Sequence, residues 1–226
     1  MSLILSIETS SKNCSVSVSK DGVLLDSIEE NSDSFSHAEN LHFFCEKIID
    51  QTNLSFSKID AYAFSEGPGS YTGLRIGAAA IKGFAFCFER PVILISTMKA
   101  LAYAHKEKDK LLCPLIDSRK GEVYMALYDC NMKTLMAPHS HVISENSLIE
   151  FLKYHKISFF GTGNEKLKEV VNHGNAHFIN NVFPSSKYLI ELAHLKYNQK
   201  NFADISNFEP LYLKEFIPTK QKKNII

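Results

Sequence analysis

Hydrophobic and polar residues alternate over the first thirty positions in the pattern of three β-strands. Residues 3–8 form an apolar run, and the next segment places Val16 and Val18 on one face and serines on the other. Asp21-Gly22 favours a tight hairpin turn before a third extended segment. The pattern predicts an antiparallel meander at the start of the chain.

Helical and extended patterns alternate in the rest of the chain. Apolar residues at helical spacing predict helices at residues 37–50, 73–88, 97–106, 144–154, 165–172 and 184–198. Short apolar runs between turns predict strands at residues 59–65, 91–95, 111–117, 122–128, 135–143, 157–161 and 176–179. The order βββαβαβα nearly recurs, so we expect an α/β fold with two halves of mixed sheets flanked by helices. The expected halves are residues 1–105 and 106–214, followed by a basic tail at residues 215–226.

The helix at residues 74–88 is apolar around its whole circumference. Arg75 and Lys82 are its only charged residues. A helix of this kind is buried on more than one side, so one side faces the sheet and the other needs a second helix or a second protein. Gly77 and Gly83, with three alanines between them, would allow close backbone approach. Packing within the same chain explains the pattern equally well.

Two loops carry residues that could bind an anion. Residues 67–73 (Gly-Pro-Gly-Ser-Tyr-Thr-Gly) join a strand to a helix, where backbone N–H groups can face a phosphate, although the G-K-[ST] ending of a P-loop is absent. The loop of Thr9, Ser10 and Ser11 follows Glu8, where actin-like ATPases hold phosphate beside a metal-linked aspartate. A tight strand-to-helix connection and a plain hairpin turn are the alternative explanations.

Composition and charge narrow the possible functions. Hydrophobic residues make up 45% of the 226 positions, which excludes a disordered chain, and no apolar run reaches the ~18 to 20 residues of a membrane span. The 25 basic and 25 acidic side chains cancel, which disfavours a stand-alone nucleic-acid binder. The five cysteines lack C-x-x-C spacing, as expected in a reducing, cytoplasmic compartment.

The histidines and hydroxyl side chains do not form a catalytic or metal-binding motif. His37 and His42 are five residues apart and do not share a helical face. His139 and His141 could point the same way on a strand, but no third ligand is near them in the sequence. The G-x-S-x-G motif of a serine hydrolase is absent. We therefore expect no metal and no cofactor.

Several motifs together resemble the TsaB (YeaZ) family, the bacterial partner subunits in synthesis of N6-threonylcarbamoyladenosine in tRNA. They occur in family order over residues 3–214, and the run at residues 67–77 is the most specific. The motifs are Ile7-Glu8-Thr9-Ser10, Cys14-Ser15-Val16, His37-Ala38-Glu39-Asn40-Leu41, residues 67–77, Lys82-Gly83, residues 117–124, residues 161–164 and residues 209–214.

The resemblance implies an actin-like (ASKHA) fold of two ribonuclease-H-like halves and a non-catalytic scaffold or dimerisation role. The catalyst would be the paralogue TsaD, which holds a metal through an H-x-x-x-H motif and transfers a threonylcarbamoyl group to adenosine 37 of tRNA. Here His37 is followed by Leu41 instead of a second histidine. The implied partners are TsaD, the ATPase TsaE at the TsaB–TsaD junction, and a second copy of the chain; tRNA would be reached only through the complex.

These expectations lead to two sets of candidate residues. The expected partner interface consists of His37, Asn40, Leu41, Phe44, Arg75, Ala78, Ala79, Lys82 and Gly83. Vestigial anion or nucleotide loops are expected at Thr9, Ser10, Ser11, Gly161 and Gly163. The alternative function is an actin-like ATPase or a glycoprotease-like metallopeptidase that acts on its own.

Overall fold

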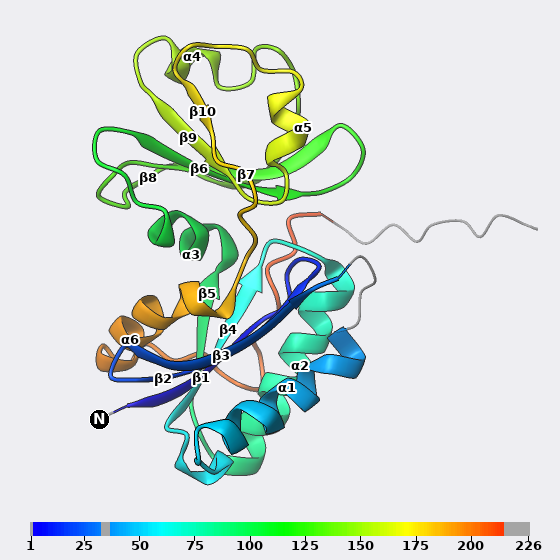
Figure 1. The fold of residues 1–226 in the computed structure, drawn as a ribbon, viewed down its shortest axis with the longest axis vertical. Helices are drawn as coiled ribbons and strands as arrows, with labels where there is room; N and C mark the ends of the chain where they lie inside the picture. The colour runs from blue at the N-terminus through cyan, green and yellow to red at the C-terminus, as the bar shows by residue number, and fades with distance from the viewer. Residues whose placement is uncertain (1, 33–36, 215–226) are drawn as a thin grey trace, which may run out of the picture.

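The computed structural model describes residues 2–32 and 37–214, and their secondary structure forms two lobes (Figure 1). The first lobe is built from β1 (Leu3–Glu8), β2 (Asn13–Lys20), β3 (Val23–Asn31), α1 (His37–Gln51), η1 (Phe56–Lys58), β4 (Ala61–Gly67), α2 (Tyr71–Phe88), β5 (Val92–Ser96) and α3 (Thr97–Ala104). The chain then forms β6 (Leu111–Asp117), β7 (Glu122–Tyr128), β8 (Thr134–Val142), α4 (Ile149–Leu152), β9 (Ile157–Phe160), α5 (Asn164–Lys168), β10 (Ala176–Phe178), η2 (Ser186–Leu189) and α6 (Ile190–Asn198).

The two sheets have the same topology. The first has the strand order β3-β2-β1-β4-β5 and the second has the order β10-β9-β6-β7-β8. In each sheet the first strand pairs antiparallel with the second and parallel with the strand that follows the first helix. The predicted α/β fold with two related mixed sheets is therefore confirmed.

The two faces of the first sheet differ in the size of their side chains. The face that carries Val16, Val18, Tyr62 and Phe64 packs against α1 and α2 in one core. The opposite face has isoleucines on β1 and β5 but small residues, serines and alanines, on β2 and β4, and it packs against α3, η2 and α6. Small side chains let these helical segments approach the sheet closely, so residues from both ends of the chain share this core.

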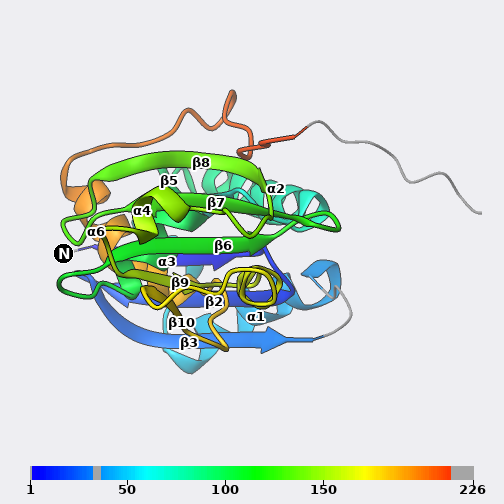
Figure 2. The same cartoon turned by 90° about the horizontal axis from the view of Figure 1, so that it is seen from above.

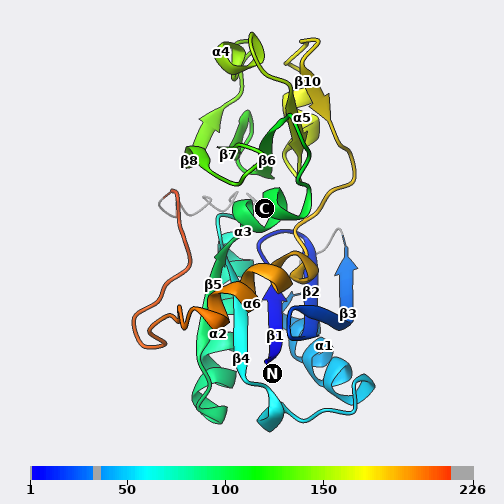
Figure 3. The ribbon, with the colours of Figure 1, turned by 90° about the vertical axis from the view of Figure 1, so that its left-hand side faces the viewer.

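Two segments, α3 and residues 199–214, pack beside elements that are distant from them in the sequence. α3 lies between the sheets in Figure 3, and its Met98 and Leu101 pack against Leu112 and Phe160 of the second sheet. After α6, residues 199–214 run back along the first lobe toward the N-terminal end of α2, as Figure 2 shows. We name these residues the C-terminal strap. The division near residue 105 stays a prediction, and the predicted tail at 215–226 lies outside the described residues.

The helix predicted at residues 144–154 is much shorter in the structure. α4 covers only Ile149–Leu152, because the preceding residues form a turn. The Ser147 hydroxyl accepts the backbone N–H of Ser144 and contacts the His141 ring, and Leu148 adopts a left-handed conformation. A left-handed residue interrupts the helical hydrogen-bond ladder. None of the described helices combines the length and apolar character that a membrane span needs.

Candidate functional site: a helical face and an interlobe cleft

The outward side of α2 presents a ridge with a small centre, between Arg75 at one end and Phe86 at the other. Arg75, Ala79, Gly83 and Phe86 are all exposed, and their spacing of three or four residues places them on one face of the helix. Phe86 is 83% exposed. A Cβ added at Gly83 would meet no atom within 4 Å. We name these four residues the α2 ridge; its small centre could let a partner's backbone come close.

A shallow apolar groove of about 430 Å³ separates the α2 ridge from α1. Its lining residues are Ala38, His42, Ile76, Ala79, Ala80, Gly83 and Phe84. Phe84 stacks on Phe56 and Tyr62, at ring-centroid distances of 5.1 and 5.6 Å. These contacts hold one wall of the groove in place. Phe43 of α1 does not line this groove and is 57% exposed.

The structure divides the nine predicted interface residues by accessibility. The exposed residues are Arg75, Ala79 and Gly83, and the partly exposed ones are Asn40 and Lys82. The buried residues are His37, Leu41, Phe44 and Ala78. Other accessible side chains of α1 and α2 were not predicted: Ala38, His42, Phe43, Ile76, Phe84 and Phe86. Phe43 of α1 and Phe86 of α2 are large apolar residues on predicted helices, which is a signal that the sequence offers. Helical spacing alone does not show which face of each helix points outward.

The glycines of residues 67–77 are explained by close packing. A Cβ at Gly69 would lie 2.3 Å from the Ser10 carbonyl oxygen, and a Cβ at Gly73 would lie 2.1 Å from the Thr9 carbonyl oxygen. Both distances are far inside van der Waals contact, so only glycine fits. The Ser70 hydroxyl accepts the N–H of Gly73 at 3.2 Å and caps α2. Because these glycines have no Cβ, the start of α2 can pack directly against the backbone of the β1–β2 hairpin.

Most of the β1–β2 hairpin loop is buried, although its Lys12 is exposed. Thr9, Ser10 and Ser11 are 0%, 1% and 7% exposed. The His37 ring donates a hydrogen bond of 2.7 Å to the Ser11 carbonyl oxygen, so the first turn of α1 holds the loop from the other side. The hydroxyl oxygens of Thr9 and Ser10 are buried. Ser11 and Lys12, however, line a hollow of about 380 Å³ together with Thr162 of the second lobe.

The equivalent loop of the second lobe is also tightly packed. Gly161 has a φ of +107°, which favours glycine. A Cβ at Gly161 would lie 2.2 Å from the Leu115 carbonyl oxygen, and one at Gly163 would lie 2.7 Å from the Val123 side chain. The glycines of both candidate anion loops thus serve close packing.

Glu8 lies at the end of β1 beneath this hairpin and is 1% exposed. Its carboxylate accepts the backbone N–H of Ser10 at 2.5 Å. Burial raises the pKa of Glu8, and hydrogen bonds from Ser10 and Ser65 only partly oppose that effect. A carboxyl group binds a metal in its ionised form, and a raised pKa makes that form less favourable. Among the described residues, no three His, Cys, Asp or Glu side chains are placed to hold a metal.

Replacing Glu8 with glutamine is expected to stabilise the protein increasingly as the pH rises. The unfolded Glu8 ionises near its ordinary pKa of 4.5, whereas the folded group ionises at a higher pH. Ionisation in the folded state therefore lowers the wild-type free energy of unfolding from pH 4.5 upward, and the variant lacks this loss. Urea titrations between pH 4.5 and 8 would measure the difference. A difference that stays constant with pH would contradict the expectation.

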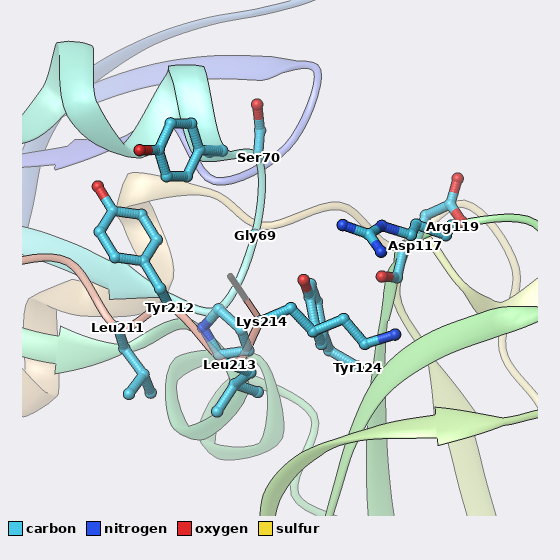
Figure 4. A pocket seen from close by; sticks show the side chains of 12 residues that line it. Gly69, Ser70, Asp117, Arg119, Tyr124, Leu211, Tyr212, Leu213 and Lys214 are labelled. Carbon is cyan, nitrogen blue, oxygen red and sulfur yellow. The ribbon is translucent and has the colours of Figure 1, made fainter. Parts of the chain in front are cut away.

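A second hollow, the interlobe cleft, opens between the lobes with a volume of about 300 Å³ (Figure 4). Its walls are residues 68–71 before and in α2, residues 117–119 between β6 and β7, Tyr124 of β7, and residues 211–214 of the strap. The carboxyl ends of β4 and β6 face this opening, a common location for ligand sites in α/β folds. In Figure 4 the Arg119 guanidinium extends toward the loop of Gly69 and Ser70.

The C-terminal strap connects the α2 ridge to the cleft. The Tyr212 and Tyr71 rings lie 4.9 Å apart, and the Arg75 guanidinium lies 4.3 Å from the Tyr71 ring. A hydrogen bond with Tyr212 raises the pKa of Arg75. Lys214 forms an ion pair with Glu122 of the second lobe. The strap thus fixes one wall of the cleft and contacts both lobes.

Comparison with known proteins places the chain among those of the threonylcarbamoyl pathway. The family model of TsaD, described as tRNA N6-adenosine threonylcarbamoyltransferase, matches residues 31–186. The Haemophilus influenzae protein TsaB is 28% identical, over 96% of each chain. A Staphylococcus haemolyticus tRNA N6-adenosine threonylcarbamoyltransferase is 34% identical, but over 50% of this chain and only 38% of its own length.

A solved structure supports the same relationship. YeaZ from Pseudomonas aeruginosa is 25% identical, with a TM-score of 0.78, and the match covers 94% of this chain and all of the YeaZ chain. The end-to-end agreement with TsaB and YeaZ contrasts with the partial match to the longer transferase. Within the group that the TsaD family model describes, the chain therefore belongs to the TsaB (YeaZ) family.

Proposed function

We propose that this chain is a non-catalytic subunit that binds a TsaD-type transferase through α1 and α2 and supports threonylcarbamoyl transfer to adenosine 37 of tRNA. The observation that carries the proposal is the open surface formed by the α2 ridge, with its exposed Phe86, and the apolar groove beside it. Contiguous apolar surface on a protein usually marks a partner site. Burying a phenylalanine side chain is worth roughly 1.5–3 kcal/mol, so Phe86 alone could supply a substantial part of the binding energy.

The packing around the β1–β2 hairpin supports a role other than catalysis. In the described part of the chain, the hydroxyls of Thr9 and Ser10 are buried, and burial raises the pKa of Glu8. The relatives named TsaB belong to the biosynthesis of threonylcarbamoyladenosine in tRNA. These observations fit an accessory subunit of the transferase that has no catalytic activity of its own.

The same surface suggests an order of assembly. TsaD would pack two helices against α1 and α2, and TsaE would dock at the resulting junction. A second copy of the chain would occupy the surface when TsaD is absent. tRNA would reach the active site on TsaD within the complex.

Co-expression with the TsaD paralogue of the same organism tests this function. We expect the two proteins to purify together, and the pair to modify tRNA when threonylcarbamoyl-AMP is supplied. The chain alone is expected to show no transferase, peptidase or substantial ATPase turnover. Robust metal-dependent turnover by the chain alone, or failure to bind TsaD, would overturn the proposal.

A further inference from the structure

The α2 ridge borders a second groove, which lies between α2 and the C-terminal strap. This strap-side groove has a volume of about 280 Å³. Its inner wall includes Arg75 and Ala79 of the α2 ridge, and its outer wall is formed by residues 208–210 and Tyr212 of the strap. Because Ala79 lines this groove and also the groove beside α1, the two grooves and the ridge between them form one continuous surface.

The strap forms a fixed wall for this groove. Phe208 is only 7% exposed and packs into the core of the first lobe. The backbone N–H of Leu211 donates to the Glu66 carbonyl oxygen at 2.7 Å, which ties the strap to the end of β4. A partner that enters the groove therefore meets a wall that is already ordered, and the entropic cost of binding is lower than for a loose segment.

The strap also supports the Arg75 side chain. The Tyr212 ring of the strap lies 4.9 Å from the Tyr71 ring, and the Arg75 guanidinium lies 4.3 Å from the other member of the pair, Tyr71. A guanidinium is planar and stacks well on an aromatic face. Tyr212 thus fixes Tyr71, and Tyr71 fixes the orientation of Arg75 at one end of the α2 ridge.

The Arg75 guanidinium keeps hydrogen-bonding capacity toward the groove. A guanidinium has five N–H donors, and Arg75 is exposed. Within the described chain its neighbours are the Tyr71 ring and the Tyr212 hydroxyl, and no carboxylate lies within ion-pair distance of it; Glu209 acts on it only at longer range. Arginine and tyrosine are enriched among the residues that dominate binding energy at interfaces, and this cluster combines both.

We propose that the strap is part of the partner interface, and that Arg75, positioned by Tyr71 and Tyr212, binds a carboxylate of the TsaD-type partner in the strap-side groove. This inference rests on the proposed function, since it extends the surface of α1 and α2 that binds the same partner. The guanidinium fork matches a carboxylate with two parallel hydrogen bonds. Tyr212 is a positioning residue, because it acts through Tyr71 on Arg75.

Calorimetric titration of the TsaD-type partner into the full chain, at several NaCl concentrations, tests the role of Arg75. Arg75→Gln should weaken binding roughly ten- to thirtyfold, as at an interface hot spot. Arg75→Lys should lose nearly as much, because an ammonium group does not provide the planar fork. The wild-type affinity should fall as NaCl is raised, and the Arg75→Gln affinity should fall less, since salt screens an exposed charge pair.

A double-mutant cycle tests the positioning role of Tyr212. Tyr212→Leu removes the ring and keeps apolar volume. It should weaken partner binding by about threefold or more in the wild-type background and should have no further effect in the Arg75→Gln background. A residue that only stabilised the fold, or that touched the partner independently, would have the same effect in both backgrounds. If Tyr212→Leu does not fold, Tyr212→Phe, which loses only the hydroxyl next to Arg75, is used in the same cycle.

Matched controls are available in the second lobe. Lys153→Gln and Tyr154→Leu alter exposed residues beside α4 and should leave partner binding unchanged. The inference is overturned if folded Arg75→Gln protein binds the partner as tightly as Lys153→Gln protein, or if the Arg75 and Tyr212 effects are additive. Loss of binding in Ala79→Arg with full binding in Arg75→Gln would overturn only this inference. Absence of binding by the wild-type chain would overturn the proposed function as well.

Discussion

Substituting arginine for Ala79 is expected to abolish stable binding of the TsaD-type partner while the protein stays folded. Ala79 is exposed at the centre of the α2 ridge and lines the groove beside α1. Arginine would fill the space that a partner helix needs and would bring an unpaired charge into an apolar contact. At a central interface position such a change costs roughly 2 to 4 kcal/mol, or about 30- to 1,000-fold in affinity.

Titration of TsaD against the purified variant, by calorimetry or pull-down, measures this effect. Ala137→Arg is the matched control, because Ala137 is an exposed alanine on β8 of the other lobe. Arginine at Ala78 or Ala80 should instead destabilise the fold, since these residues are only 6% and 5% exposed. If folded Ala79→Arg protein bound TsaD as tightly as Ala137→Arg protein, the α2 ridge would not be the interface.

Replacing Gly73 with alanine is expected to destabilise the fold by about 3 kcal/mol or more, above the usual cost of overpacking a core. The new methyl group would lie 2.1 Å from the Thr9 carbonyl oxygen and 3.2 Å from the His37 ring. A backbone carbonyl cannot rotate away, so α2 or the β1–β2 hairpin would have to move. The improved helix propensity of alanine, worth about 1 kcal/mol, does not offset this clash.

Gly83→Ala in the same helix is the matched control. Its added Cβ would meet no atom within 4 Å, so the variant should be up to about 1 kcal/mol more stable than wild type. Urea unfolding followed by circular dichroism compares the two. Equal stability of the Gly73 and Gly83 variants would show that the contact between α2 and the hairpin is not close in solution.

The order of the elements, and the burial of α2 on more than one side, could be predicted from the sequence. The alternation around Val16 and Val18 identifies β2, and the recurrence of βββαβαβα predicts two similar sheets, as the structure shows. A helix without a polar face must be buried on more than one side, and α2 indeed packs on the sheet and beside α1. Periodicity determines these features because it reports which residues of one element share a face.

Which face of α1 and of α2 is exposed, and which segments cover the other faces, depended on the tertiary structure. Periodicity could not distinguish exposed Ala79 from buried Ala78 and Ala80, because the small residues follow one another without a polar marker. The same limit applies to His37, whose ring is held by the Ser11 carbonyl oxygen of another element. The predicted interface therefore included residues that the core buries.

Contacts between distant parts of the chain could not be predicted from the sequence for a related reason. The serine face of β2 is covered by η2, where the hydroxyls of Ser15 and Ser186 hydrogen-bond at 2.7 Å across 171 positions of sequence. Likewise, Arg119, Tyr124 and Lys214 meet Ser70 only in the interlobe cleft. A local pattern fixes the conformation and polarity of a segment, whereas long-range packing decides its neighbour, and so the interlobe cleft became visible only in three dimensions.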